Sequence, residues 1–126
     1  MKQVQRGFTL IELVMVIVIL GVLAAVALPK FVDLKGDAET AAVLGVAGGI
    51  SSASSINYAA RSVSTSNGTA TANTTCQAAA TAILQGGVPS GYTVSGSVGA
   101  AGTTASCNVA LTADSTKSAT ASIVGI

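Results

Sequence analysis

The most apolar segment of the chain lies near its N-terminus. From Phe8 to Leu28 the sequence reads FTLIELVMVIVILGVLAAVAL, in which Glu12 is the only charged residue. As a helix, these residues span about 30 Å, the thickness of the hydrocarbon core of a membrane. The run therefore predicts a transmembrane helix. Lys2 and Arg6 precede it, which places the N-terminus in the cytoplasm and the remainder of the chain outside.

The helical pattern continues beyond Pro29, where we expect a kink rather than an end. After the apolar part at 8–29, an amphipathic half at 30–61 carries one face of small or apolar residues, at three- and four-residue steps: Val43, Val46, Ile50, Ala53, Ile56 and Ala60. We therefore predict one long helix from Phe8 to about Arg61, packed by this face on a core. Four glycines weaken it by about 1 kcal/mol each relative to alanine and predict local bending or melting: Gly36, Gly45, Gly48 and Gly49.

The next segment, 62–91, is rich in small polar residues and predicts a loop that contains one short helix. That helix covers residues 76–85, with Thr74 or Thr75 as its cap and a glycine pair at its end. Residues 92–126 then predict a small sheet, because three stretches alternate between apolar and polar residues: Tyr92–Val98, Ala105–Thr112 and Ala119–Ile126. The expected fold is α+β, with the long helix packed on an antiparallel sheet of three to four strands.

The chain has two cysteines, Cys76 and Cys107, with neither the CxxC spacing nor a histidine that a zinc site needs. A disulfide is the better prediction, and closing a loop of this length stabilises the fold by about 3–4 kcal/mol. Disulfides form in oxidising compartments, so this part of the chain is expected outside the cytoplasm. Lys2 and Arg6, which precede the apolar run, also indicate that this part lies outside the cytoplasm.

Composition narrows the possible functions. The chain has 126 residues, a formal net charge of +1, 9% charged residues and no histidine, and its mean hydropathy is +0.69. It therefore offers no basic surface for nucleic acid and no histidine for acid–base chemistry. Nucleophile triads, phosphate loops and zinc spacings are also absent from the sequence. We predict neither an enzyme nor a cofactor, metal or catalytic site.

Glu12 is the residue that most strongly indicates a function. A carboxylate inside a membrane helix costs about 2.5–3.5 kcal/mol, which favours a dedicated partner. If the chain were cleaved after Gly7, Phe8 would begin it with a free amine about one helical turn from Glu12. That amine, on the same or a neighbouring subunit, is the candidate partner.

The string GFTLIELVMVIVILGVLAAVALP resembles the N-terminal signature of type IV pilins and of the related pseudopilins of type II secretion. The resemblance implies a prepilin peptidase that removes residues 1–7, cutting between Gly7 and Phe8, and methylates Phe8. It also implies that Glu12 directs assembly, together with Phe8. Between Gly21 and Pro29, the resemblance implies a helix that can lose its order in the filament.

The following residues, PKFVDLKGDAETAAVLGVAGGISSASSINYA, are similar to the mannose-sensitive haemagglutinin type of pilin within the type IVa group. This resemblance implies a precursor in the inner membrane, with its N-terminus in the cytoplasm and its head in the periplasm. The subunit then polymerises into an extracellular pilus. Its partners would be other copies of the chain, the prepilin peptidase and the pilus assembly machinery, with no nucleic acid bound by the lone subunit.

The predicted function is that of a structural subunit of a type IV pilus that serves adhesion, with motility and DNA uptake left open. The alternative is a pseudopilin of a type II secretion system. The cysteine pair and the segment after Pro29 favour the pilus. A fibre that conducts electrons through stacked aromatic rings is disfavoured, because only 3% of the residues are aromatic.

Overall fold

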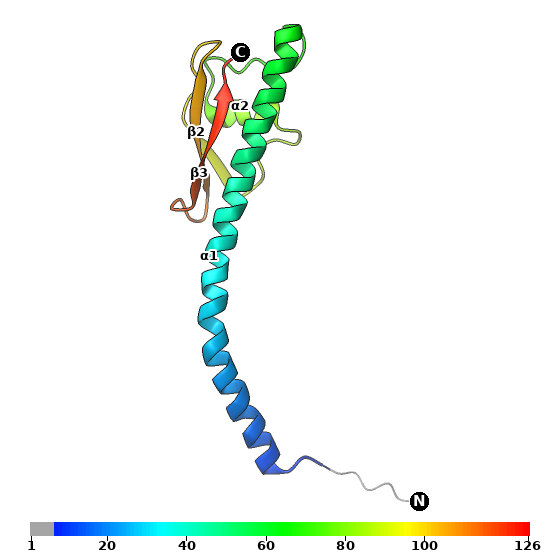
Figure 1. Cartoon of the computed structure of the whole chain (residues 1–126), viewed down its shortest axis with the longest axis vertical. Coiled ribbons are helices and arrows are strands. Elements are labelled where there is room, and N and C mark those ends of the chain that lie inside the picture. Colours follow the sequence, from blue (N-terminus) through cyan, green and yellow to red (C-terminus); the bar gives the residue numbers. More distant parts are fainter. Residues whose placement is uncertain (1–6) are drawn as a thin grey trace, which may run out of the picture. The chain divides into compact units, whose positions relative to one another are not determined.

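The computed structural model describes residues 7–126, with the side chain of Asp33 excepted. Its elements follow in the order α1 (Leu10–Val63), α2 (Cys76–Ile83), β1 (Tyr92–Ser95), β2 (Thr104–Leu111) and β3 (Ser118–Val124) (Figure 1). This order confirms the predicted long helix, short helix and three strands. The chain divides into two compact units, Met1–Asp37 and Ala38–Ile126, each with its own part of α1. We call the second unit the head.

Helix α1 begins at Leu10 and ends at Val63, two residues later at each end than predicted. It continues through Pro29 and through all four glycines of the amphipathic half. Melting, one of the two outcomes expected at these glycines, is therefore wrong for the lone chain, and bending stays a prediction. Strong helix formers such as alanine and leucine surround the glycines, so the cost of about 1 kcal/mol for each glycine does not break the helix.

The face of α1 that packs on the head is rotated from the predicted one. Its buried residues are spaced by alternating steps of four and three: Val43, Ala47, Ile50, Ser54 and Asn57. The predicted Ile56 is instead 71% exposed. The prediction was wrong here because two polar residues, Ser54 and Asn57, are buried with hydrogen-bond partners in the head.

The three strands form an antiparallel meander in the order β1-β2-β3, as predicted. Apolar side chains of β2 and β3 face the core, among them the fully buried Val109 and Ile123. Strand β1 ends at Ser95 rather than at the predicted Val98, because Gly96 has a φ of +116° and redirects the chain. Ser97 then forms an isolated bridge with Thr75, just before α2.

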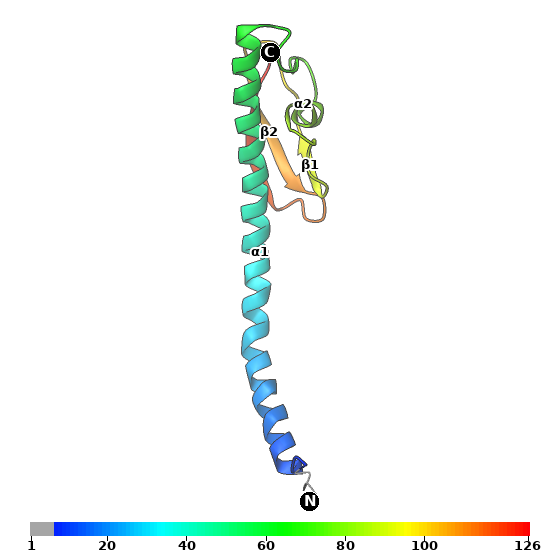
Figure 2. The same cartoon turned by 90° about the vertical axis from the view of Figure 1, so that its right-hand side faces the viewer.

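Hydroxyl groups cover the free edge of β3. The backbone N–H of Ser122 donates to Ser51 Oγ at 3.0 Å, and that of Val124 donates to Ser54 Oγ at 2.9 Å. Both serines belong to α1, which lies beside the sheet in the head (Figure 2). These bonds satisfy backbone groups that an open edge strand would offer to another chain.

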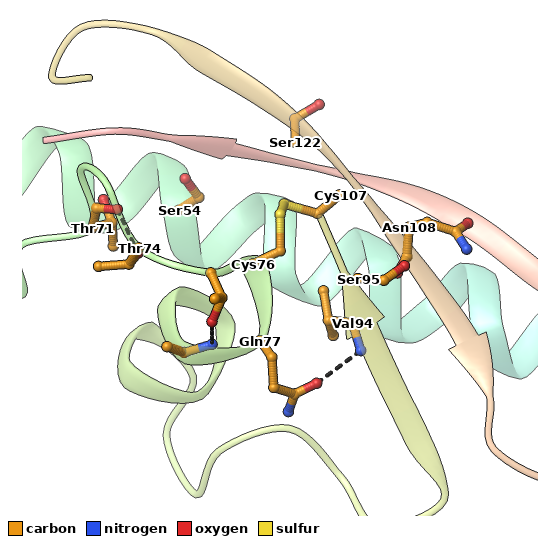
Figure 3. Close-up of a disulfide and its surroundings, with 12 residues drawn as sticks. Ser54, Thr71, Thr74, Cys76, Gln77, Val94, Ser95, Cys107, Asn108 and Ser122 are labelled. Atoms are coloured by element: carbon orange, nitrogen blue, oxygen red, sulfur yellow. Dashed lines mark hydrogen bonds between the residues drawn. A yellow bond between two sulfur atoms is a disulfide. The ribbon is translucent and has the colours of Figure 1, made fainter. Parts of the chain in front are cut away.

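The predicted disulfide between Cys76 and Cys107 is confirmed. It joins the first residue of α2 to β2 (Figure 3), both cysteines are fully buried, and their Cα atoms are 5.8 Å apart. Thr75, one of the two predicted caps, is the N-cap of α2, since its Oγ1 accepts from Ala78 N at 3.2 Å. Helix α2 ends at Ile83, two residues before the predicted end.

Candidate functional site

The candidate functional site is the first part of α1, which exposes an unusual amount of apolar surface. Every large apolar side chain from Phe8 to Leu34 is at least 43% exposed. An 18-residue window of the helix has a mean hydropathy of 3.0, and none of it is buried within the chain. By length and composition, α1 can therefore cross a membrane, whereas the core helix of a soluble protein would be mostly buried.

Glu12 lies in the first turn of α1, where it forms a capping box with Thr9. Glu12 Oε2 accepts from the backbone N–H of Thr9 at 2.8 Å and from its Oγ1 at 2.9 Å. In return, Glu12 N donates to Thr9 Oγ1 at 3.3 Å. This reciprocal pattern satisfies N–H groups that the first helical turn otherwise leaves free, and it holds the carboxylate at the positive end of the helix dipole.

Sequence reasoning missed Thr9. The signal was present, because a threonine three residues before a glutamate at the start of an apolar run is the pattern of a capping box. From the sequence, the partner predicted for Glu12 was only the amine that cleavage would create. The structure shows that the carboxylate already has partners within its own helix.

Gly7 and Phe8 lie outside the helix at the predicted cleavage point. Both are exposed, Phe8 to 89%, and neither belongs to a helix or strand. A Cβ atom placed on Gly7 would meet nothing within 4 Å, so packing within the chain does not require glycine there. An exposed, non-helical peptide bond is the kind that proteases reach.

The two residues predicted to mark a melting segment, Gly21 and Pro29, are both helical in this structure. A Cβ atom on Gly21 would also meet nothing within 4 Å. No contact within the chain therefore explains this glycine, and loss of helical order in a filament stays a prediction. Within residues 7–126, no three His, Cys, Asp or Glu side chains gather as a metal site would require.

The chain matches known proteins through its N-terminal signature. Residues 2–28 match the prokaryotic N-terminal methylation motif. The chain is 46% identical over 63 residues to a fimbrial protein of Eikenella corrodens, covering 50% of this chain and 41% of the relative. It is 53% identical over 51 residues to the major component of the type IV narrow pilus of Thermus thermophilus, covering 40% of this chain and 44% of the relative.

A third relative is a type IV major pilin of Neisseria gonorrhoeae, 49% identical over 53 residues, which are 42% of this chain and 32% of that protein. The chain thus spans less than half the length of each of these relatives. No solved structure matches it significantly. The long helix, the small three-stranded sheet and the single disulfide are consistent with a pilin fold. The chain is thus a protein with the prokaryotic N-terminal methylation motif whose relatives are type IV pilins and fimbrial proteins.

Proposed function

We propose that this chain is a structural subunit of a type IV pilus, which polymerises through the first part of α1 into a surface filament. One observation carries the proposal: the methylation motif coincides with a helix whose apolar side chains have no cover within their own chain. Each such side chain gains about 1.5–3 kcal/mol when it is fully buried. Lipid provides that cover first, and the same helices of neighbouring copies provide it in the filament.

The precursor would lie in the inner membrane with its N-terminus in the cytoplasm and its head in the periplasm. A prepilin peptidase would remove residues 1–7 and methylate Phe8. The pilus assembly machinery would then add the subunit to the filament, where the charge of Glu12 pairs with the amine of Phe8. The capping box supports this role, because it holds the carboxylate at the end of the helix where that amine would appear.

The relatives favour a pilus over a secretion pseudopilin, since they are a fimbrial protein, a pilus component and a major pilin. Adhesion is the role we propose for the filament, by analogy with the mannose-sensitive haemagglutinin type. A structural role also fits a head that consists mostly of small uncharged residues.

The assembly role of Glu12 is tested by Glu12→Gln. Glutamine keeps the hydrogen bonds of a capping box but removes the charge, so the helix start is retained while the ion pair is lost. We expect a subunit that is inserted and cleaved but rarely incorporated into fibres, as measured by immunoblots of sheared fibres and of membranes. Glu39→Gln, the same exchange in the amphipathic half, is the control and should leave fibre yield unchanged. Normal fibre yield from Glu12→Gln would refute the role.

Leader removal is tested by Gly7→Ser. Since Gly7 has no packing role within the chain, the exchange should leave the fold intact. We expect the uncleaved precursor to accumulate, visible as the larger mass in membrane extracts. A mature mass equal to that of the wild type would contradict the assignment of this cleavage site.

A further inference from the structure

The head has few charges, and Arg61 has no charged partner among the described residues. Between Ala38 and Ile126 the sequence contains only Glu39, Arg61, Asp114 and Lys117 as charged residues. Arg61 lies in the last turn of α1 and donates from Nη1 to the backbone oxygen of Thr65 at 2.9 Å. Its Nε is buried without a hydrogen-bond partner among the described residues. Because this atom is buried, a second molecule can reach Arg61 only at the terminal nitrogens of its guanidinium.

Gly68, beside Arg61, lines a groove of about 380 Å³ in the head. One wall comes from α1, with Ile56 and Ala60, another from Gly68 and the last from the end of α2, with Ile83. The aliphatic part of Arg61 adjoins this groove, because its Cγ lies 3.2 Å from the point where a side chain on Gly68 would begin. Ile56, at 71% exposure, is the large apolar side chain that the groove leaves uncovered.

Asp114 is the carboxylate that the head leaves available. It lies in the turn between β2 and β3, where its Oδ1 accepts from Thr116 Oγ1 at 2.6 Å and from Thr116 N at 3.0 Å. These two hydrogen bonds, with a smaller contribution from Lys117, hold the pKa of Asp114 below its ordinary value. The carboxylate is therefore charged at neutral pH, and its second oxygen, Oδ2, has no protein partner among the described residues.

The two groups cannot meet within one chain. The C-terminal end of α1 and the turn between β2 and β3 lie at opposite ends of the head in both views (Figures 1 and 2). A contact between opposite ends of identical molecules joins different surfaces of the two copies. Such a contact cannot form a symmetric dimer, and when repeated it builds an open helical fibre unless its rotation closes into a ring.

We propose that the groove beside Arg61 receives the turn 112–117 of a second copy of this chain, with Asp114 of that copy paired to Arg61. The planar guanidinium is suited to a carboxylate, with which it forms two parallel hydrogen bonds. Ala113 at the turn is small and exposed, so it can enter beside Ile56 without displacing a polar group. The inference rests on the proposed function, because it supplies a contact between heads in the same filament.

A pair of introduced cysteines tests the contact in intact fibres. Ala60→Cys places a thiol in the groove and Ala113→Cys places one on the turn, so a chain with both can link to a copy on either side. We expect oxidised fibres of this double variant to give a ladder of multimers on a non-reducing gel and monomers after reduction. Each single variant should give dimers at most. Chains with Ala113→Cys and Thr93→Cys, in which the second thiol lies on the exposed face of the sheet, are the matched control and should give no ladder.

The charge pair is tested by exchanging its signs. We expect Arg61→Asp and Asp114→Arg each to increase the release of subunits from sheared fibres on heating by roughly two- to five-fold, the range of a partly exposed ion pair. The double variant should restore part of the wild-type value, since the ion pair is then reversed while the hydrogen bonds of Asp114 with Thr116 and of Arg61 with Thr65 stay lost.

The outcomes separate this contact from the proposed function. Fibres that form normally but give no ladder, or a double variant no better than the worse single one, overturn the contact and leave the proposed function standing. A wild-type chain that forms no fibres overturns the proposed function and the contact with it.

Discussion

Replacing Asn57 with alanine should destabilise the head more than replacing Ile56 with alanine. Hydrophobicity alone suggests the reverse order. Asn57 is 8% exposed and holds the loop after α1, since its Nδ2 donates to Thr69 O at 2.8 Å and its Oδ1 accepts from Thr69 N at 2.7 Å. Asn57→Ala leaves both backbone groups of Thr69 without these partners. Unsatisfied groups cost about 1–3 kcal/mol each when buried. Because Thr69 is only half-buried, water replaces part of the loss, and we expect about 1–3 kcal/mol in total.

Ile56→Ala is the matched comparison. Truncating a buried isoleucine to alanine would lower the free energy of unfolding by about 2–5 kcal/mol. At 71% exposure, however, Ile56 should cost less than about 0.5 kcal/mol, as surface positions do. For a head of this size, Asn57→Ala should lower the melting temperature by about 5–15 °C and Ile56→Ala by about 2 °C or less.

The assay is thermal unfolding of the full chain in detergent micelles, followed by near-ultraviolet circular dichroism of the tyrosines in the head. Intact mass under non-reducing conditions shows whether the disulfide has formed in each variant. A larger loss from Ile56→Ala than from Asn57→Ala would refute the packing described for α1.

Three further predictions concern the disulfide, the turn between β2 and β3, and the start of α1. Exchanging Cys76 and Cys107 together for serine should lower the free energy of unfolding of the head by about 3–4 kcal/mol, measured by urea titration; an unchanged urea midpoint would contradict it. The lowered pKa of Asp114 means that its contribution to stability is present above the unfolded pKa and is lost as the pH falls through the folded pKa. Asp114→Asn should therefore lower the melting temperature at pH 7 but not in strong acid, and an equal difference at both pH values would rule this out. Thr9→Val should weaken the first turn of α1 by about 1 kcal/mol, seen as faster amide exchange there, whereas Thr9→Ser should not; equal exchange in both variants would exclude the capping box.

The sequence predicts those features that depend on neighbours along the chain. The apolar run, the helical period and the turn residues gave the order of the elements, and the two cysteines gave the disulfide. The buried face of α1 depends instead on distant partners. Ser54 is buried because its hydroxyl accepts from Val124, 70 residues away. A count of apolar positions assigns such a serine to the surface, so the predicted face included Ile56 instead.

The same reasoning applies to the candidate site. Gly7, Phe8 and Glu12 were predicted from a short, distinctive string, and the role of each stays a prediction. Thr9 could have been found from its spacing to Glu12, because a capping box is a local pattern. The lack of a charged partner for Arg61 could not have been predicted from the sequence, because it depends on which end of the head holds the turn with Asp114.

The most direct test of the account is the intact mass of the subunit recovered from sheared surface fibres. We predict a chain that begins at a methylated Phe8 and contains the bridge between Cys76 and Cys107. Fibres from which this chain is absent, or in which it begins at Met1, would contradict the claim that cleavage and the apolar helix make it a filament subunit.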